Sequence, residues 1–424
     1  MNVSHNKVQI MKRIAIILLL FVIFETCFSQ SESKNIDWNK DIEFLRVELP
    51  KNHKNFFFKK SEKSFNKGLD QIISQKDSLS DLEISLKLQQ LIASFGDSHT
   101  RINWYPFLKK KDFLPIGLYW FSDGIYILKT SKEYEDLLGK RIVKVNGYSI
   151  KEITDSLKTL ITLDNKALVK HFVPNILQAT KVLDYFGFSN KGIYKLELAD
   201  DSRNTQIKQI KASVVDKQFV SFRTKKTIYS WQDKRISYLL KYFENEKILY
   251  VKYNSCRPTT KELQKDGTFI TISFKDFQKQ IFSILKQKEV DKFIFDMRFN
   301  DGGNSIYGTK FVKKLSKNKI HSDSTLYVVI GRETFSSAIL NTLDFKENTK
   351  AIVVGENTGG KPNHYGEIRS FKLPNSGILV YYSTKYFKRV NVEMNTIQPD
   401  VVIEMSFKEY KQGTDPVFEW IINN

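Results

Sequence analysis

The chain has 424 residues, enough for two or three domains, and its hydrophobic content of 41% with 13% aromatic residues excludes disorder throughout. A formal net charge of +20 is compatible with a nucleic-acid partner, with an anionic envelope surface or with simple solubility. The lysines are spread along the chain and no nucleic-acid-binding motif is present, so we expect no nucleic-acid partner.

The N-terminus has the pattern of a secretory signal peptide. Basic residues at 12–13 precede an apolar run at 14–24 that is too short to span a membrane, and small and polar residues follow. We predict a signal peptide over 1–30 and export across the inner membrane, to a periplasmic, secreted or envelope-associated location. An uncleaved membrane anchor is the alternative. After cleavage Cys256 is the only cysteine left, which excludes an internal disulfide and a cysteine-rich metal site.

A helical segment follows the signal peptide. Residues 36–95 have apolar residues at helical spacing, as in DLEISLKLQQLIASF, and the pattern stops at Gly96. We assign a helical N-terminal segment to 31–110. The polar sequence D-S-H-T comes directly after the stop, at 97–100.

The next region is rich in short strands. The stretches LPIGLYW, GIYILKT and GKRIVKVNGYSI within 114–150 are separated by Asp-Gly and Asn-Gly turns. A glycine near the first strand, an intervening helical stretch and a strand that ends in V-N-G resemble a PDZ domain, which adds an extended peptide end to its sheet edge. We assign a PDZ-like β-rich domain to 111–212, and a generic small β-rich domain is the alternative.

Strands and helices alternate over the rest of the chain. Helical spacing over 273–287 lies among near-continuous apolar strands, which implies an α/β core with a largely parallel sheet. We assign this core domain to 213–424. The predicted strands are 247–253, 292–297, 325–330 and 351–354. Loops at the carboxyl ends of such strands are where sites are built.

Three of these strand ends have unusual sequences. R-F-N-D-G-G-N follows the second strand, and G-R-E-T-F-S-S-A follows the third and leads into a helix. The loop after the fourth, GENTGGKPN, is nearly a phosphate-binding G-x-x-x-x-G-K-[ST] loop. Pro362 stands where that motif needs a hydroxyl, and no helical pattern follows, so we do not expect nucleotide binding.

A serine at a strand-to-helix turn is held exposed, and backbone N–H groups at the helix start and at a glycine pair can point at the same space. These turns therefore indicate a nucleophile with an oxyanion hole. Taken alone, a serine at a helix start is usually a cap.

The combined motifs carry a family resemblance. D-x-R-x-N-x-G-G, then T-x-S-x-A, then G-E-x-T-x-G-K, after a PDZ-like segment, resembles the tail-specific (C-terminal processing) serine peptidases. The tricorn core protease belongs to the same superfamily. The resemblance covers about residues 95–404 and is sharpest over 292–366. It implies a crotonase-like (ClpP/crotonase) α/β core, polypeptide substrates, and no metal or organic cofactor.

Residue roles follow from the resemblance. Ser336 is the nucleophile, and the oxyanion hole is made by the N–H of Ser337 and one from Gly302 or Gly303. Lys361 occupies the general-base position of the tail-specific branch.

The tricorn branch instead uses a histidine from an S-H-T segment, which His99 matches, and a late carboxylate, for which Glu393 is the best-placed candidate. A histidine needs less pKa tuning than a lysine to act as a base near neutrality, so we favour His99 over Lys361. His364 is a third candidate for the base. The residues expected to support the site are Ser98, Glu356 and His364.

Two departures from the tail-specific pattern leave an alternative open. Ile339 stands where that branch usually has Glu, and Pro362 where it has Gly. The favoured hypothesis is a secreted serine endopeptidase whose PDZ-like domain captures polypeptide substrates by an end. The second is a catalytically inactive peptide- or ligand-binding protein on the same scaffold. The sequence does not indicate the oligomeric state.

Overall fold

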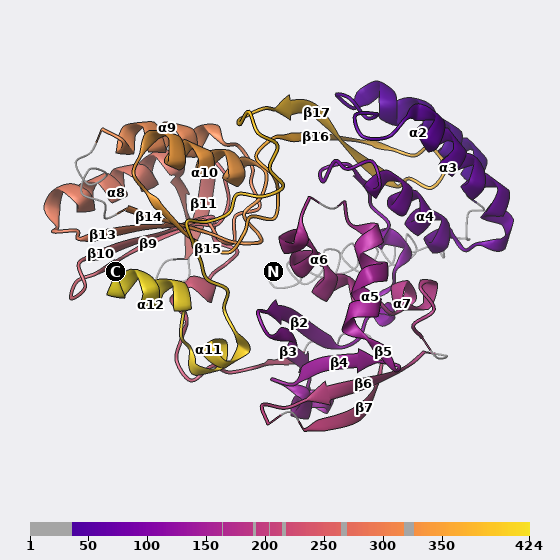
Figure 1. The fold of residues 1–424 in the computed structure, drawn as a ribbon, viewed down its shortest axis with the longest axis horizontal. Helices are drawn as coiled ribbons and strands as arrows, with labels where there is room; N and C mark the ends of the chain where they lie inside the picture. Colours follow the sequence, from indigo (N-terminus) through magenta and orange to yellow (C-terminus); the bar gives the residue numbers. More distant parts are fainter. Residues whose placement is uncertain are drawn as a thin grey trace, which may run out of the picture.

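The computed structural model describes residues 36–162, 164–189, 192–202, 204–213, 218–263, 269–317 and 326–424. The expected signal peptide lies outside these residues. We name three parts along the chain in Figure 1: the helical part (36–110), the middle part (111–221) and the sheet part (222–424). Within the described ranges, no helix combines the length and apolar character that a membrane span requires.

The helical part consists of three helices, where the sequence predicted helical structure over 36–95. Each begins at a side chain that caps it, and the third has a full capping box between Ser80 and Glu83. Their apolar faces share one buried cluster. The helices are α2 (Trp38–Asn52), α3 (Glu62–Gln75) and α4 (Asp81–Ala93).

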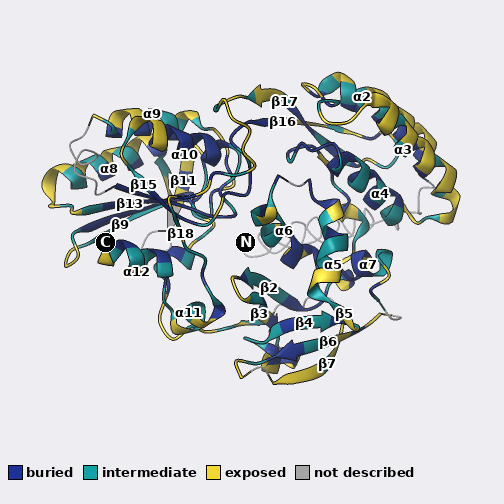
Figure 2. Cartoon of the chain, in the orientation of Figure 1, coloured by how far each residue is buried: buried dark blue, intermediate teal, exposed yellow. Residues whose placement is uncertain are grey.

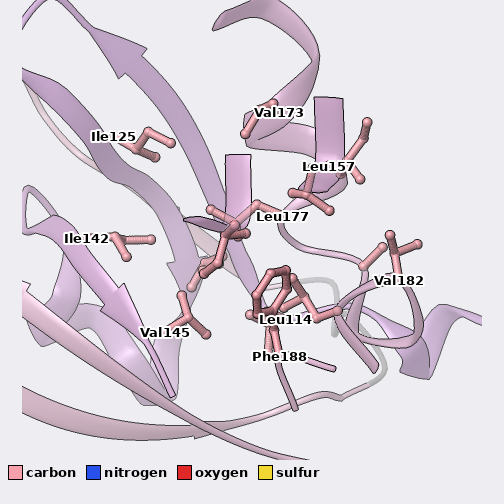
Figure 3. Packing of buried hydrophobic residues seen from close by; sticks show 14 of the residues in the cluster. Leu114, Ile125, Ile142, Val145, Leu157, Val173, Leu177, Val182 and Phe188 are labelled. Carbon is pink, nitrogen blue, oxygen red and sulfur yellow. The ribbon is translucent and has the colours of Figure 1, made fainter. Parts of the chain in front are cut away.

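The middle part is a strand-rich unit with three helices. Its sheet has the order β2-β3-β4-β6-β7, β5 pairs with β4, and β8 pairs with β3, so the sheet extends past residue 212. Figure 3 shows its core, in which Leu114 and Phe188 pack with residues from the sheet and the helices. The elements are β2 (Ile116–Phe121), β3 (Gly124–Ser131), β4 (Arg141–Val145), β5 (Tyr148–Ser149), α5 (Ile150–Leu157), α6 (Lys166–Ile176), α7 (Thr180–Tyr185), β6 (Ile193–Ala199), β7 (Thr205–Lys211) and β8 (Phe219–Ser221).

The sheet part contains a six-stranded sheet of order β18-β15-β14-β13-β10-β9. All neighbouring pairs are parallel except β9 with β10. Buried strands alternate with helices, which confirms the predicted mixed α/β class. The elements are β9 (Tyr238–Phe243), β10 (Ile248–Tyr253), β11 (Thr259–Leu263), β12 (Phe269–Ser273), α8 (Phe274–Gln287), β13 (Lys292–Asp296), α9 (Ile306–Leu315), β14 (Leu326–Ile330), α10 (Ser337–Asn348), β15 (Ile352–Gly355), β18 (Val401–Val402), α11 (Phe407–Gln412) and α12 (Pro416–Asn423).

Helices cover both faces of this sheet. One face packs with α8, α9 and α10, and the other packs with α12, in two separate buried clusters. Figure 2 shows the central strands as buried between these layers. Because both faces are covered, the strand sequences are continuously apolar rather than alternating.

A long hairpin connects the sheet part to the helical part. Strands β16 (His364–Lys372) and β17 (Leu379–Phe387) pair with each other, and β17 also pairs with β1 (Arg101–Ile102), in the order β1-β17-β16. Figure 1 shows the hairpin running between the sheet part and α2. Val380 and Ile378 from the hairpin end lie in the same buried cluster as the three N-terminal helices. The segment that carries His99 is therefore held against the sheet part.

Candidate active site

Three turns at the carboxyl ends of β13, β14 and β15 form one connected unit. The Thr334 hydroxyl donates to the Met297 carbonyl at 2.8 Å, and Phe335 N donates to the Asn300 carbonyl at 3.0 Å. Gly359 N donates to the Thr334 carbonyl at 3.1 Å. Since the three strands are neighbours in the sheet, these bonds fix the turns relative to one another.

Ser336 has a strained backbone and a hydroxyl that does not cap the helix. It precedes α10 with φ 52° and ψ −121°, a conformation that a residue with a Cβ rarely adopts. Its side chain makes no capping hydrogen bond. The neighbouring Ser337 is buried, and its hydroxyl donates to the Gly303 carbonyl at 2.7 Å. The Ser337 hydroxyl thus makes a structural hydrogen bond, whereas the Ser336 hydroxyl remains available to react.

The glycine pair lies against the start of α10. A Cβ on Gly302, which has φ 110°, would stand 2.8 Å from Ser336 Cβ and 3.1 Å from Ser337 N. Gly302 N itself donates to the Asn300 side chain at 2.9 Å. Among the described residues, Gly303 N and Ser337 N donate to no acceptor. The sequence left open which glycine serves the oxyanion hole, and this bonding favours Gly303 with Ser337.

Two histidines lie beside the nucleophile turn in a row of four stacked rings. Phe335, the residue before Ser336, stacks on His99 with 4.6 Å between ring centroids. His99 stacks on His364 at 5.6 Å, and His364 stacks on Phe387 at 5.4 Å. His99 is therefore the histidine ring that lies directly against the nucleophile turn.

His99 is neutral in this environment. Its side chain is 2% exposed, and burial lowers its pKa from 6.5 to about 4 even though the nearby Asp97 carboxylate acts in the opposite direction. His364 and Arg101 also disfavour the charged form. Neither ring nitrogen makes a well-formed hydrogen bond within the described residues, although the Tyr365 backbone also favours the charged form. A neutral imidazole with a free nitrogen can accept a proton.

His364 is buried as well, but one of its nitrogens is occupied. Nδ1 lies 3.0 Å from the Lys361 carbonyl and 3.2 Å from the Pro362 carbonyl, so we assign the proton to Nδ1. Burial lowers its pKa. Its Nε2 is left as an acceptor, one ring further from the nucleophile turn than His99.

Lys361 is paired with a buried carboxylate. Its ammonium lies 3.6 Å from the Asp164 carboxylate, and Lys361 is not among the residues that line the Ser336 cavity. Burial raises the pKa of Asp164 to about 6, against the effect of the Lys361 charge. The structure therefore pairs Lys361 with Asp164, and Lys361 does not line the cavity onto which Ser336 opens.

The other acidic candidates lie outside the cavity wall. Glu356 forms a bidentate ion pair with the buried Arg332, at 2.6 and 2.8 Å, and Arg332 also donates to the Trp120 carbonyl of β2. Glu393 is exposed and accepts a bond from the Asn363 side chain at 3.2 Å. Glu356 thus holds Arg332 in the loop before Ser336, whereas Glu393 does not line the cavity onto which Ser336 opens.

Ser336 opens onto a cavity of about 890 Å³ that all three parts line. Ser98, which the sequence analysis named as a supporting residue, lies in this wall, and so does Asp301. Representative lining residues are Ser98, His99, Phe172, Gly303, Ser336 and His364. The volume is sufficient for several residues of an extended peptide. Within the described ranges, no three His, Cys, Asp or Glu side chains are grouped to hold a metal ion.

Sequence reasoning missed Asp97 and Asp164. Asp97 is part of the same D-S-H-T sequence as His99, but nothing in the residue types shows that its carboxylate is buried at 4% exposure. Asp164 lies far along the chain from Lys361, and no motif signals their pairing.

Part of the sheet part resembles a known protein family. The sequence profile of peptidase family S41 matches residues 308–403, which include Ser336. The structure of mature CPAF complexed with lactacystin is similar over 92% of this chain and 98% of that chain, with 13% identity and a TM-score of 0.61. Mature CPAF is similar over 91% and 94%, with 13% identity and a TM-score of 0.55. At this identity the likeness shows a shared fold. Comparison with curated protein sequences finds no match.

Proposed function

We propose that this chain is an endopeptidase that uses Ser336 and His99. The chain is a serine-type peptidase, and its residues 308–403 match the profile of the tail-specific family S41. One observation carries this assignment. A strained serine whose hydroxyl does not cap its helix and a buried neutral histidine line the same cavity, beside two backbone N–H groups that have no acceptor among the described residues. These are the parts that acyl transfer requires.

The steps follow from the geometry. The Ser336 hydroxyl gives its proton to His99 as its oxygen bonds to the peptide carbonyl carbon. Gly303 N–H and Ser337 N–H hold the resulting oxyanion. His99 then gives the proton to the leaving amine, and water releases the acyl group by the same route. Because His99 is stacked between two rings, little reorganisation is needed as the proton moves.

The surrounding parts are assigned by the same proposal. The sheet part is the crotonase-like peptidase core, and the middle part is the PDZ-like domain. In the middle part, β2 is a terminal strand of the sheet and α6 packs against it, an arrangement that suits the addition of a peptide end. The N-terminal signal sequence supports export to the periplasm, the envelope or the medium.

Hydrolysis of unfolded protein substrates tests the function. Ser336→Ala should abolish cleavage, while Ser202→Ala, which removes an exposed hydroxyl from the middle part, should cleave at the unchanged rate. Peptide affinity should survive in Ser336→Ala. A chain that binds peptides but cleaves none, with or without Ser336, is the inactive binding protein instead.

A further inference from the structure

Asp97 is a buried carboxylate that the catalytic steps above leave unused. It lies at the end of the helical part, two residues before His99. Oδ1 accepts a bond from His99 N at 3.0 Å, and Oδ2 accepts from the Thr100 hydroxyl. His53 Nε2 lies 2.9 Å from Oδ2. A carboxylate with this many donors is held in a single orientation.

His53 acts as a neutral donor in this group. The backbone N–H of Asn55 donates to His53 Nδ1 at 3.0 Å, so Nδ1 carries no proton and Nε2 is the protonated nitrogen. His53 therefore donates to Asp97 and does not carry the compensating positive charge. Although burial acts to raise it, the His53 bond and the His99 ring keep the pKa of Asp97 below its ordinary value.

The negative charge of Asp97 faces the proposed base. His99 Nδ1 lies 3.9 Å from Asp97 Oδ1, too far for a hydrogen bond in the resting state but close enough for a strong charge interaction in a buried site. The other titratable or charged groups around His99 are Arg101 on its own segment and His364 on β16, and both disfavour a positive imidazole. Among the charged groups, Asp97 favours the positive imidazole, and the uncharged Tyr365 backbone acts in the same direction.

We infer that Asp97 is a positioning residue that fixes His99 and stabilises its imidazolium, with His53 holding the Asp97 carboxylate in place. This inference rests on the proposed function. With Nδ1 turned towards Asp97, Nε2 of His99 is the nitrogen that accepts the Ser336 proton. The carboxylate thus comes from the segment of the base itself and not from Glu393, which is exposed.

The test is kcat per active site, counted by titration with a serine-directed acylating reagent. Asp97→Asn keeps an oxygen for the His99 N–H bond but removes the charge. We expect kcat to fall about 100-fold with KM nearly unchanged. We also expect the acid limb of the kcat/KM profile to move to lower pH, because the imidazolium loses its stabilising charge. Asp77→Asn, at an exposed surface carboxylate of the helical part, should leave all three quantities unchanged.

A pair of His53 variants provides a second measurement should Asp97→Asn fail to fold. His53→Gln retains an amide donor for Asp97, and His53→Leu does not. We expect His53→Leu to lose about tenfold in kcat and His53→Gln to recover most of it. A role in folding alone would lower the number of titrated sites in both variants without changing kcat per site, and that result would overturn the inference.

Failure of the inference is distinct from failure of the function. If Ser336→Ala and His99→Ala are inactive but Asp97→Asn keeps the kcat and pH profile of the unchanged protein, only the inference is wrong. A large loss in Glu393→Gln alongside full activity in Asp97→Asn would assign the role to Glu393. Full activity in Ser336→Ala would remove the proposed function itself.

Discussion

The two halves of the candidate site are built in different ways. The nucleophile half comes from turns after adjacent parallel strands, and local hydrogen bonds fix Ser336 and its oxyanion donors. The base half comes from the end of the helical part, and it reaches the site because β1 pairs with β17 of the hairpin. The first half depends on local backbone geometry, whereas the second depends on a long-range strand pairing.

Among the variants that leave Ser336 in place, the largest effect is expected in the base half. His99→Ala should lower kcat about 1,000-fold, because His99 is the base that stacks on the nucleophile turn in the part of the chain that the structure describes. The measurement is peptide hydrolysis by the purified variant. Near-full activity in His99→Ala together with an inactive Lys361→Ala would reverse the assignment of the base.

The matching test of the nucleophile half is Gly302→Ala. The new Cβ would clash with Ser336 Cβ and displace the start of α10, so we expect about a 100-fold loss of kcat. Gly147→Ala is the control, since Gly147 also has a positive φ, 87°, but its Cβ would meet nothing within 4 Å. Both variants should lose about 1 kcal/mol of stability from backbone strain. Equal activity in Gly302→Ala and Gly147→Ala would show that Gly302 is not needed for the geometry of the site.

The burial of His99 predicts an acid-sensitive fold. The unfolded side chain binds a proton below its ordinary pKa of 6.5, whereas the folded one does so only near 4. The unfolded state therefore gains protons first, and the free energy of unfolding should fall by about 2 kcal/mol between pH 7.5 and pH 5 from this group. Urea unfolding of His99→Gln should show a correspondingly smaller fall. An identical pH dependence would mean that His99 is solvated.

The smallest effect is expected at Lys361. Lys361→Met removes the partner of the buried Asp164, so stability should fall by about 1–3 kcal/mol. Activity should fall only a few-fold, because the ammonium pairs with Asp164 and Lys361 does not line the Ser336 cavity. Thermal unfolding and peptide hydrolysis of the same sample measure the effect on stability and the effect on activity separately. A loss as large as that of His99→Ala, in a folded variant, contradicts the placement of Lys361.

The contrast between local and long-range features explains which parts of the site could be predicted from the sequence. Apolar strands alternating with helices predicted the mixed α/β class, and the glycine pair and the F-S-S-A turn predicted the place of Ser336, because both are local signals. The ion pair of Lys361 with Asp164 joins distant segments and leaves no local pattern. Glu393 was chosen from its position late in the chain, and its exposure is decided by how the loop after the hairpin packs.

The most direct test of the account is the site and rate of acylation by a fluorophosphonate probe, followed by peptide mass spectrometry. We predict a single labelled peptide containing Ser336, formed about 100-fold more slowly in His99→Ala and at the unchanged rate in Ser202→Ala. Label on another residue, or equal rates with and without His99, would contradict the claim that this histidine activates this serine.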